Sequence, residues 1–445
     1  MGPMIQGVRI GRREFADEGK SNIHEFDYWH QDHKVNPKHR RSLVDFYLSG
    51  VKVEIKAGDA DDAKASPVGG LGVEIEHLPV RSADNPLGLP AGQAVTFAEP
   101  HGIAQVLQDL RPLFDPAREF HDEGYLLGLA KKGYALSLEP GGQVECSLDV
   151  AANGDQVVES YSLFRADIDP VLKKHGIELL TYGYQPHTLC RRIPIIPKAR
   201  YHCMDQFFGR LGSFGPNMMR ASASTQVSID YYSQEDAIEK LRLGTALGPI
   251  SAYFYRNSPF FEGRRNPYPL LRQHFWESID PNRAGILPGL YDDGFDFERA
   301  ADDILAAPLM VADLTHTPEA AISGKEEDGL VSMETYANAA EIYPDRELNP
   351  YEINRIISTH FNDVRLKNFL ELRPWDSLPI DRVRTLSDQV SALFYDRSHL
   401  ERAASFFRGV RAVDVEEAKI SLQAHGDKAR PYGEDLDFWR GFLTF

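Results

Sequence analysis

Residues 134–148 constrain the fold more than any other stretch, because they predict a tight hairpin that carries acidic side chains. Two segments of alternating polar and apolar residues flank the Pro-Gly-Gly turn at 140–142, where proline and glycine favour a sharp reversal of the chain. The period of two in a strand places Glu139 and Glu145 on one face. Carboxylates held this close repel each other unless a cation or a shared proton lies between them. The hairpin is therefore either a solvated surface element or one wall of a cation site.

A second segment of the same character, residues 71–80, supports the cation site. Glu74 and Glu76 alternate with apolar side chains and with His77, so both carboxylates face one side of a predicted strand that ends at Pro79. The four glutamates lie on short strands whose other face is apolar, and this pattern predicts a sheet with one acidic face. Such a face suits a hard divalent cation such as Mg2+, because that ion takes oxygen ligands.

The composition narrows the range of partners. The chain has 445 residues and a net charge of −17, from 49 basic and 66 acidic side chains. A protein this acidic is a poor general binder of nucleic acid or anionic membrane, so an anionic substrate would need local arginines or metal ions. No apolar run of about 18 residues predicts a transmembrane helix. We therefore expect small-molecule partners, no nucleic acid and no membrane.

The cysteines and the amino-terminal residues bear on the cellular compartment. An odd, sparse set of cysteines argues against a disulfide framework and fits a reducing compartment. Residues 1–15 lack the apolar core of a secretory signal. The predicted compartment is therefore the cytoplasm. The cysteines are Cys146, Cys190 and Cys203.

Residues 1–50 form a polar amino-terminal extension, predicted to be partly helical. Its histidines match no standard zinc-binding spacing, so a solvated segment is a better prediction than a zinc site. These histidines are His24, His30, His33 and His39.

The middle of the chain contains polar candidates for substrate binding. The connector 193–200 is rich in proline and basic side chains, and the glycine-rich loop 209–216 either approaches a phosphate or only turns the chain. Residues 222–232 alternate again, with apolar residues behind a polar face. A polar face inside an otherwise apolar region predicts a lined cavity. This face carries Ser224, Gln226, Ser228 and Asp230.

Residues 253–286 combine arginine, asparagine and aromatic side chains with several Pro and Gly breakers. Such a stretch predicts a long loop rather than a helix or strand, and long loops in compact domains are often functional. Its arginines can neutralise carboxylates or phosphates, although surface charge is the better prediction for any single one. They are Arg264, Arg265, Arg272 and Arg283.

Residues 365–373 predict one further strand, with Phe369, Glu371 and Arg373 on one face. An acidic residue with an arginine two positions away fits an ATP–metal site and a structural salt bridge equally well.

Apolar periodicity predicts helices over much of the remaining chain. A proline inside a helix removes a hydrogen bond, so one of these helices should be interrupted at Pro170. The predicted helices are 42–49, 103–110, 160–175, 201–208, 235–247, 296–306, 333–342, 350–359, 386–395, 399–410 and 415–424.

Together these motifs resemble the glutamate–cysteine ligase family, especially its plant-type and related bacterial branch. The matching segments keep the order of the family and cover residues 70 to 380. They are GVEIEH at 72–77, LEPGGQVE at 138–145, IPIIPKARY at 193–201, GSFGPNMMRASASTQVSIDY at 212–231, RNSPFFEGRRN at 256–266, RQHFWESIDPNRAG at 272–285 and VRLKNFLELRPWDSLP at 364–379.

The resemblance implies an α+β fold akin to those of glutamine synthetase and guanidino kinases, in which helices surround a curved antiparallel sheet shaped as a funnel. It also implies ATP as co-substrate and Mg2+ or Mn2+ as cofactor. The implied metal ligands are Glu74, Glu76, Glu139, Glu145, Gln226 and Glu371. The implied catalytic arginines are Arg220, Arg283 and Arg373. Substrate or ATP contacts are implied for Arg200, Met219, Gln226, Ser228, Arg272 and Trp276.

The implied reaction joins glutamate to cysteine through γ-glutamyl phosphate, the first step of glutathione biosynthesis. A ligase for a different amine, a guanidino kinase-like phosphotransferase and a silent ATP-binding protein remain alternatives. Ser228 stands where we expect asparagine, and this difference bears on the acceptor substrate more than on the ATP chemistry. The implied organisation is an extension at 1–50, a ligase domain at 51–380 and a helical segment at 381–445 packed on that domain. We expect a monomer or a homodimer.

Overall fold

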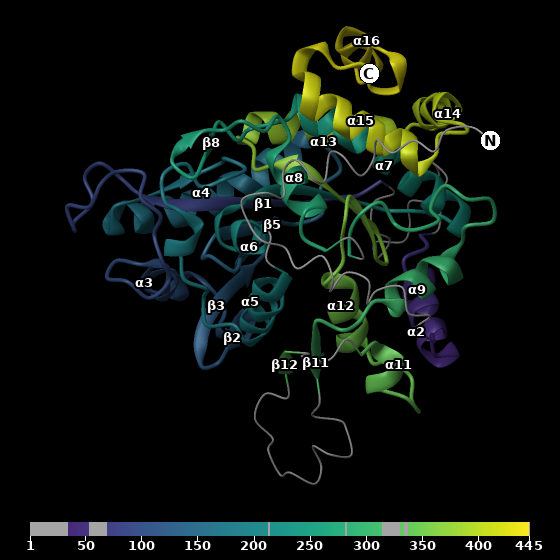
Figure 1. The fold of residues 1–445 in the computed structure, drawn as a ribbon. Coiled ribbons are helices and arrows are strands. Elements are labelled where there is room, and N and C mark those ends of the chain that lie inside the picture. Colours follow the sequence, from purple (N-terminus) through teal and green to yellow (C-terminus); the bar gives the residue numbers. More distant parts are fainter. Residues whose placement is uncertain are drawn as a thin grey trace, which may run out of the picture.

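The computed structural model describes residues 34–52, 69–211, 214–280, 283–313, 330–332 and 337–444. Within these residues the chain forms a sheet of nine strands, paired antiparallel throughout, with helices packed around it (Figure 1). The mixture of helices and antiparallel sheet confirms the predicted α+β class. In order across the sheet the strands are β14 (Val364–Leu366), β15 (Leu370–Asp376), β7 (Ser224–Ile229), β1 (Leu71–Arg81), β5 (Val144–Leu148), β4 (Tyr134–Leu138), β3 (Tyr125–Lys131) and β2 (Glu119–Asp122), and β6 (Ile177–Leu180) also pairs with β1.

The strand β1 lies at the centre, and its register gathers the acidic side chains. Glu76 stands opposite Glu145 of β5, and Glu74 stands opposite Gln226 of β7. The predicted hairpin is confirmed as β4 and β5, and its turn depends on glycine. A Cβ at Gly141 would collide with the backbone of the segment before β7, so no larger residue fits at the point of reversal.

The opposite face of the sheet is the hydrophobic core. Side chains that alternate with the glutamates, such as Val73, Ile75, Cys146 and Val227, are almost fully buried. The helices α4 (Gly154–His175) and α13 (Ile380–Tyr395) pack on this side, while α7 (Gln234–Phe254) covers β14 and β15. One face of the sheet is therefore sealed by apolar contacts, and the acidic face is left for other elements to cover.

The carboxy-terminal helices α14, α15 and α16 gather at one end of the molecule, and the small β11–β12 sheet lies at the other end (Figure 1). No helix in the described part of the chain is long and apolar enough to cross a membrane. The helices are α2 (Pro37–Leu48), α3 (Ile103–Leu110), α4 (Gly154–His175), α5 (Ala199–Leu211), α6 (Gly215–Ala221), α7 (Gln234–Phe254), α8 (Leu271–Glu277), α9 (Phe297–Ala306), α11 (Ala339–Ile342), α12 (Pro350–Ser358), α13 (Ile380–Tyr395), α14 (Arg397–Phe406), α15 (Ala412–His425) and α16 (Leu436–Phe442).

Several predictions of local structure are wrong. The strand that was predicted to end at Pro79 continues to Arg81. Residues 365–373 are not one strand but the hairpin of β14 and β15, closed by a hydrogen bond from the Lys367 N–H to the Phe369 carbonyl at 2.8 Å. The helix α4 continues through Pro170, which sits inside it without ending it. His39 is not solvated, because it is fully buried in α2 with Nε2 3.0 Å from the Tyr343 carbonyl oxygen.

Residues 253–286 are not a loop throughout, so that prediction is also wrong. The side chains of Leu271 and Phe275, four residues apart, are both buried and anchor one face of a short helix. The helix was not predicted because proline and glycine residues lie close to it on both sides in the sequence. The stretch contains α8, the strands β8 (Phe260–Phe261) and β9 (Arg264–Arg265), and β10 (Ala284–Gly285), which pairs with β13 (Phe361–Asn362).

Some predicted features lie outside the described residues. These are His24, His30 and His33, and the first part of the predicted helix 333–342.

The small sheet at the end of the molecule consists of β11 (Val311–Asp313) and β12 (Leu330–Ser332).

The three cysteines are all buried and free, which leads to a prediction about redox sensitivity. Burial raises the pKa of Cys190 to about 11 and that of the Cys146 and Cys203 thiols above the ordinary value. A buried thiol behaves as a small hydrophobe and reacts slowly, because the thiolate is the reactive form. We expect the triple Cys-to-Ala variant to keep turnover within about tenfold of wild type, since such substitutions remove few atoms. A reductant that changes wild-type turnover by much more than this, but not that of the variant, would contradict the expectation.

Candidate active site

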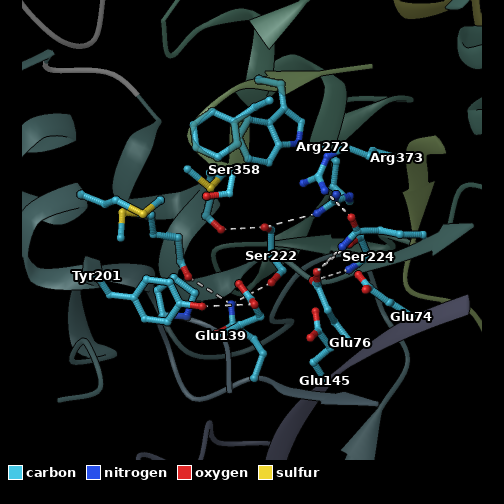
Figure 2. Close-up of a pocket in the computed structure, with 18 of the residues that line it drawn as sticks. Glu74, Glu76, Glu139, Glu145, Tyr201, Ser222, Ser224, Arg272, Ser358 and Arg373 are labelled. Carbon is cyan, nitrogen blue, oxygen red and sulfur yellow. Dashed lines mark hydrogen bonds between the residues drawn. The ribbon is translucent and has the colours of Figure 1, made fainter. Parts of the chain in front are cut away.

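The acidic face of the sheet forms the floor of a cavity of about 180 Å3 (Figure 2). Helices α5, α6, α8 and α12 supply the residues that close it from the other side. Ser224 of the predicted polar face lines this cavity, and so do ten of the residues to which the resemblance assigns roles. They are Glu74, Glu76, Glu139, Glu145, Arg200, Met219, Gln226, Arg272, Trp276 and Arg373.

Three carboxylates on this floor, that of Glu76 buried and those of Glu74 and Glu145 half-buried, have pKa values raised far above the ordinary range. Burial, followed by the charge of Glu371, raises the pKa of Glu74 to about 7. Burial and Glu139 raise the pKa of Glu76 to about 7. Burial, Glu74 and Glu139 raise the pKa of Glu145 to about 8. Within the described part of the chain, these side chains form no ion pair with a lysine or arginine, so each needs a proton or a cation to be stable.

Neutral donors hold two of these carboxylates in place. Glu76 accepts hydrogen bonds from the backbone N–H and the hydroxyl of Ser224, both at 2.7 Å, and from Gln226 Nε2 at 3.1 Å. Glu145 accepts hydrogen bonds from the Ser137 hydroxyl at 2.6 Å and from the Ser147 hydroxyl at 3.4 Å. These donors fix the position of each carboxylate without cancelling its charge.

Glu139 at the end of β4 has a partner that the sequence did not reveal. The Tyr201 hydroxyl donates to Glu139 Oε1 at 3.2 Å, and Lys198 Nζ lies 3.3 Å from the same hydroxyl. Both partners belong to the segment IPIIPKARY, of which only Arg200 was predicted to contact substrate. Tyr201 directly follows Arg200 in that motif, and this adjacency is the sequence feature from which a place in the site could have been predicted.

The turn of the hairpin is bound to the helix α6 through Gln143. Its Oε1 accepts from the Gly141 N–H at 2.7 Å, and its Nε2 donates to the carbonyl oxygens of Met219 and Ser222 at 3.1 and 2.8 Å. Gln143 therefore fixes the hairpin relative to the methionine-rich wall of the cavity.

Arginines face the carboxylates across the cavity (Figure 2). Arg373 bonds to Gln226 Oε1 and, at 2.8 Å, to Glu371. Arg272 donates from Nη1 to the Ser222 hydroxyl at 3.3 Å, and its buried Nε lies 3.9 Å from Asp376 Oδ1 but forms no hydrogen bond in the described structure. Buried donors without a partner are costly, so they mark places where an anionic ligand would be stabilised.

The remaining wall is apolar. The rings of Trp276 and Phe361 stack with their centroids 4.8 Å apart. Three methionines complete this surface, and Met204, Met218 and Phe361 were not predicted. A cavity with an acidic floor, a cationic side and an aromatic side can hold charged and planar groups at the same time.

Four residues with predicted roles do not line the cavity, and their roles remain predictions. Arg220 forms two hydrogen bonds with the Asp205 carboxylate, at 2.7 and 2.6 Å. Arg283 is buried against Asp280 at 2.9 Å and the Pro308 carbonyl. The other two, Ser228 and Glu371, stand opposite each other on β7 and β15.

Glu371 differs electrostatically from the other glutamates. Burial would raise its pKa, but Arg365, Arg373 and Lys367 outweigh that effect and hold the pKa at about 2. The Arg365 and Arg373 nitrogens lie 2.5 and 2.8 Å from Oε2. The structure therefore shows the salt bridge, and the role of Glu371 as a metal ligand stays a prediction.

In the part of the chain that is described, no group of three or more His, Cys, Asp or Glu side chains is arranged as a ready-made metal site. The carboxylates on the cavity floor provide the oxygen donors that Mg2+ prefers, but they do not form a finished coordination shell.

With the geometry established, the comparisons identify the family. The family model described as "Glutamate-cysteine ligase family 2(GCS2)" matches residues 71–422, and the chain therefore belongs to the glutamate–cysteine ligase family. It is 34% identical over 299 residues to glutamate–cysteine ligase B, chloroplastic, of Oryza sativa subsp. japonica, covering 67% of this chain and 59% of that protein. It is 33% identical over 337 residues to the chloroplastic glutamate–cysteine ligase of Nicotiana tabacum, covering 75% and 62%. The chain thus spans about three fifths of the length of these relatives.

These relatives overturn the prediction of a cytoplasmic protein, because their names place them in chloroplasts. The prediction rested on the sparse, odd set of cysteines and on the absence of an apolar signal core. That absence speaks only against a secretory signal, since transit peptides are amphipathic and have no such core.

Proposed function

We propose that this chain is an ATP-dependent γ-glutamyl ligase that joins glutamate to L-cysteine and releases ADP and phosphate. The observation that carries the proposal is the cavity itself, in which buried and half-buried glutamates without ion pairs face arginines whose Nε atoms form no hydrogen bond. Membership of the glutamate–cysteine ligase family supports the same reaction.

The chemistry of the floor fits a divalent cation. Glu74, Glu76, Glu139 and Glu145 would hold Mg2+ or Mn2+ together with Gln226, and the cation would satisfy the charge that burial now makes costly. When bound, the metal would bind the phosphates of ATP and offset the charge that develops during phosphoryl transfer.

The residues opposite the floor would orient the substrates. A carboxylate is a poor electrophile, and its phosphorylation by ATP supplies a leaving group that an amine can displace. In our proposal Arg272 and Arg200, whose buried Nε atoms form no hydrogen bond, hold anionic groups, and the Trp276–Phe361 stack offers a planar surface. Positioning and charge neutralisation are the main contributions that proteins make to this kind of transfer.

The finer description of the fold belongs to the same proposal. We infer a funnel-shaped sheet of the glutamine synthetase type, with residues 51–380 as the ligase domain and residues 381–445 packed on it. The packing of α13 on β1 and β7, and of α15 on α7, supports this division.

The reaction can be tested by incubating the protein with Mg-ATP, glutamate and a panel of amines and measuring the nucleotide released. We expect ADP, with cysteine as the preferred acceptor. Turnover with another amine but not with cysteine would identify a related ligase. A stable phosphorylated guanidine formed without glutamate would identify a kinase, and release of AMP or no turnover with any amine would contradict the proposal.

A further inference from the structure

The helix α8 supplies Arg272 and Trp276 to the cavity, yet it is too short to fix its own orientation. It has seven residues, no side chain caps its amino terminus, and isolated helices of this length are unstable in water. Its position must therefore be set by neighbouring elements. The helix packs on α6, β10 and β15. In addition, two side chains of one helix of the carboxy-terminal segment, α15, reach its two ends.

Gln423 of α15 holds the start of α8. The backbone N–H of Leu270, the N-cap residue of α8, donates to Gln423 Oε1 at 3.0 Å. Gln423 Nε2 donates to the Leu270 carbonyl oxygen, also at 3.0 Å. One side-chain amide thus satisfies both backbone groups of the residue from which α8 begins.

Lys419, one turn earlier on α15, holds the other end of α8. Its side chain is buried, and Nζ lies 3.5 Å from Oε1 of Glu277, the last residue of α8. The same Nζ lies 2.7 Å from Asp363 Oδ2 and 3.4 Å from Glu416 Oε1. Burial lowers the pKa of Lys419, but these three carboxylates outweigh burial and keep it above its ordinary value, so the ammonium stays charged.

Asp363 extends this connection to the opposite side of the cavity. It follows the strand that carries Phe361, and its carbonyl oxygen accepts from the Arg373 N–H at 3.2 Å. A second cavity, of about 20 Å3, lies behind the first and has room for about one water molecule. Four residues line both cavities. They are Arg272, Trp276, Phe361 and Arg373.

We propose that Lys419 and Gln423 are positioning residues, which place Arg272 and Trp276 in the cavity by holding the two ends of α8. The inference rests on the proposed function, since it concerns the same site. It assigns a role in the reaction to the carboxy-terminal segment, which contributes no residue to the cavity lining.

Gln423→Met tests the inference, because it removes both hydrogen bonds to Leu270 and keeps the length of the side chain. Gln389→Met is the matched control. Gln389 lies on α13 and accepts from the Tyr255 hydroxyl at 2.6 Å, away from α8. A small displacement of a substrate-binding group is costly, so we expect kcat/KM of Gln423→Met to fall roughly tenfold and that of the control to stay near wild type. Both variants should lose some thermal stability.

Two further measurements separate positioning from general stability. We expect hydrogen exchange of the amides at 271–277 to accelerate in Gln423→Met and not in Gln389→Met. We also expect the effects of Gln423→Met and Arg272→Lys on kcat/KM to be non-additive, because both act through Arg272. Exchange at wild-type rates, or additive effects, would overturn the proposal.

Lys419→Met would leave three carboxylates close together and can fail to fold, so Lys419→Arg is the second variant. It keeps the charge and changes the geometry, and we expect α8 to exchange faster in this folded variant too. Unchanged exchange in Lys419→Arg would remove Lys419 from the proposal. The exchange measurement needs no turnover, so a protein inactive with every amine would contradict the proposed function without deciding whether α15 holds α8.

Discussion

Glu145→Gln should abolish most turnover and yet leave the metal-free protein at least as stable as wild type above pH 8. The substitution keeps the size of the side chain and removes one charge. Glu145 stands opposite Glu76 on the cavity floor and has no ion-pair partner there. If this carboxylate holds a cation that binds ATP, its loss should reduce turnover by about 10²-fold or more, as for other preorganised electrostatic groups.

The stability effect depends on pH, with a defined sign. The pKa of Glu145 is raised from 4.5 to about 8 in the folded protein, so the folded state binds this proton more tightly than the unfolded state. The associated stability is fully present below pH 4.5 and is lost as the pH rises through about 8. Glutamine stays neutral and loses nothing. We therefore expect the variant to gain stability relative to wild type between pH 5 and 9, on the order of 1 kcal/mol or more at the upper end.

Thermal unfolding at pH 6 and pH 9, with and without Mg-ATP, measures both effects. The variant should show weaker protection by Mg-ATP than wild type at either pH. Glu178→Gln, on the exposed side of β6 in the same sheet, is the matched control and should change neither turnover nor protection. Near-normal turnover of Glu145→Gln at limiting Mg2+ would show that Glu145 does not bind the metal and that the hairpin has only a structural role.

The floor of the site was predictable because its geometry is local. Alternation along a strand decides which face a side chain takes, and Glu74, Glu76, Glu139 and Glu145 all follow that rule. The pairing of the two acidic segments could also be predicted, because the apolar side chains on the other face of both strands have to be buried in the same core.

The rest of the site depends on contacts between distant parts of the chain. Arg220 and Arg283 carry the charge expected of catalytic groups, but the fold pairs them with Asp205 and Asp280. Tyr201, near the start of α5, lines the cavity, and its hydroxyl contacts the Leu138 carbonyl oxygen and Glu139 of the hairpin. This contact joins parts of the chain about 60 residues apart, so the alternation of polar and apolar residues could not predict it. The contact between Gln423 and Leu270 joins positions 153 residues apart, so the role of α15 could not be read from the pattern of helices alone.

Glu371→Gln is the same chemical change on the same face of the sheet, and we expect the opposite effect on stability. Glu371 is buried among Arg365, Lys367 and Arg373, with nitrogen–oxygen distances of 2.5, 3.7 and 2.8 Å. Removing its charge leaves these cations without their counter-charge in a buried setting. Breaking a buried ion pair from one side typically costs about 3–5 kcal/mol, so the free energy of unfolding at pH 7 should fall by about that amount.

The pH dependence of this variant distinguishes a salt bridge from a metal ligand. The folded pKa of Glu371, at about 2, lies below the unfolded value of 4.5, so its contribution is present above pH 4.5 and is lost as the pH falls towards 2. Wild type should therefore approach the stability of Glu371→Gln in urea titrations as the pH is lowered from 7 to 3. Turnover should also fall, because Arg373 loses the partner that orients it, while the affinity for Mg2+ should change little. If instead Glu371→Gln unfolds like wild type and Mg2+ affinity collapses, Glu371 binds the metal directly, and the three cations around it serve the phosphates rather than the fold.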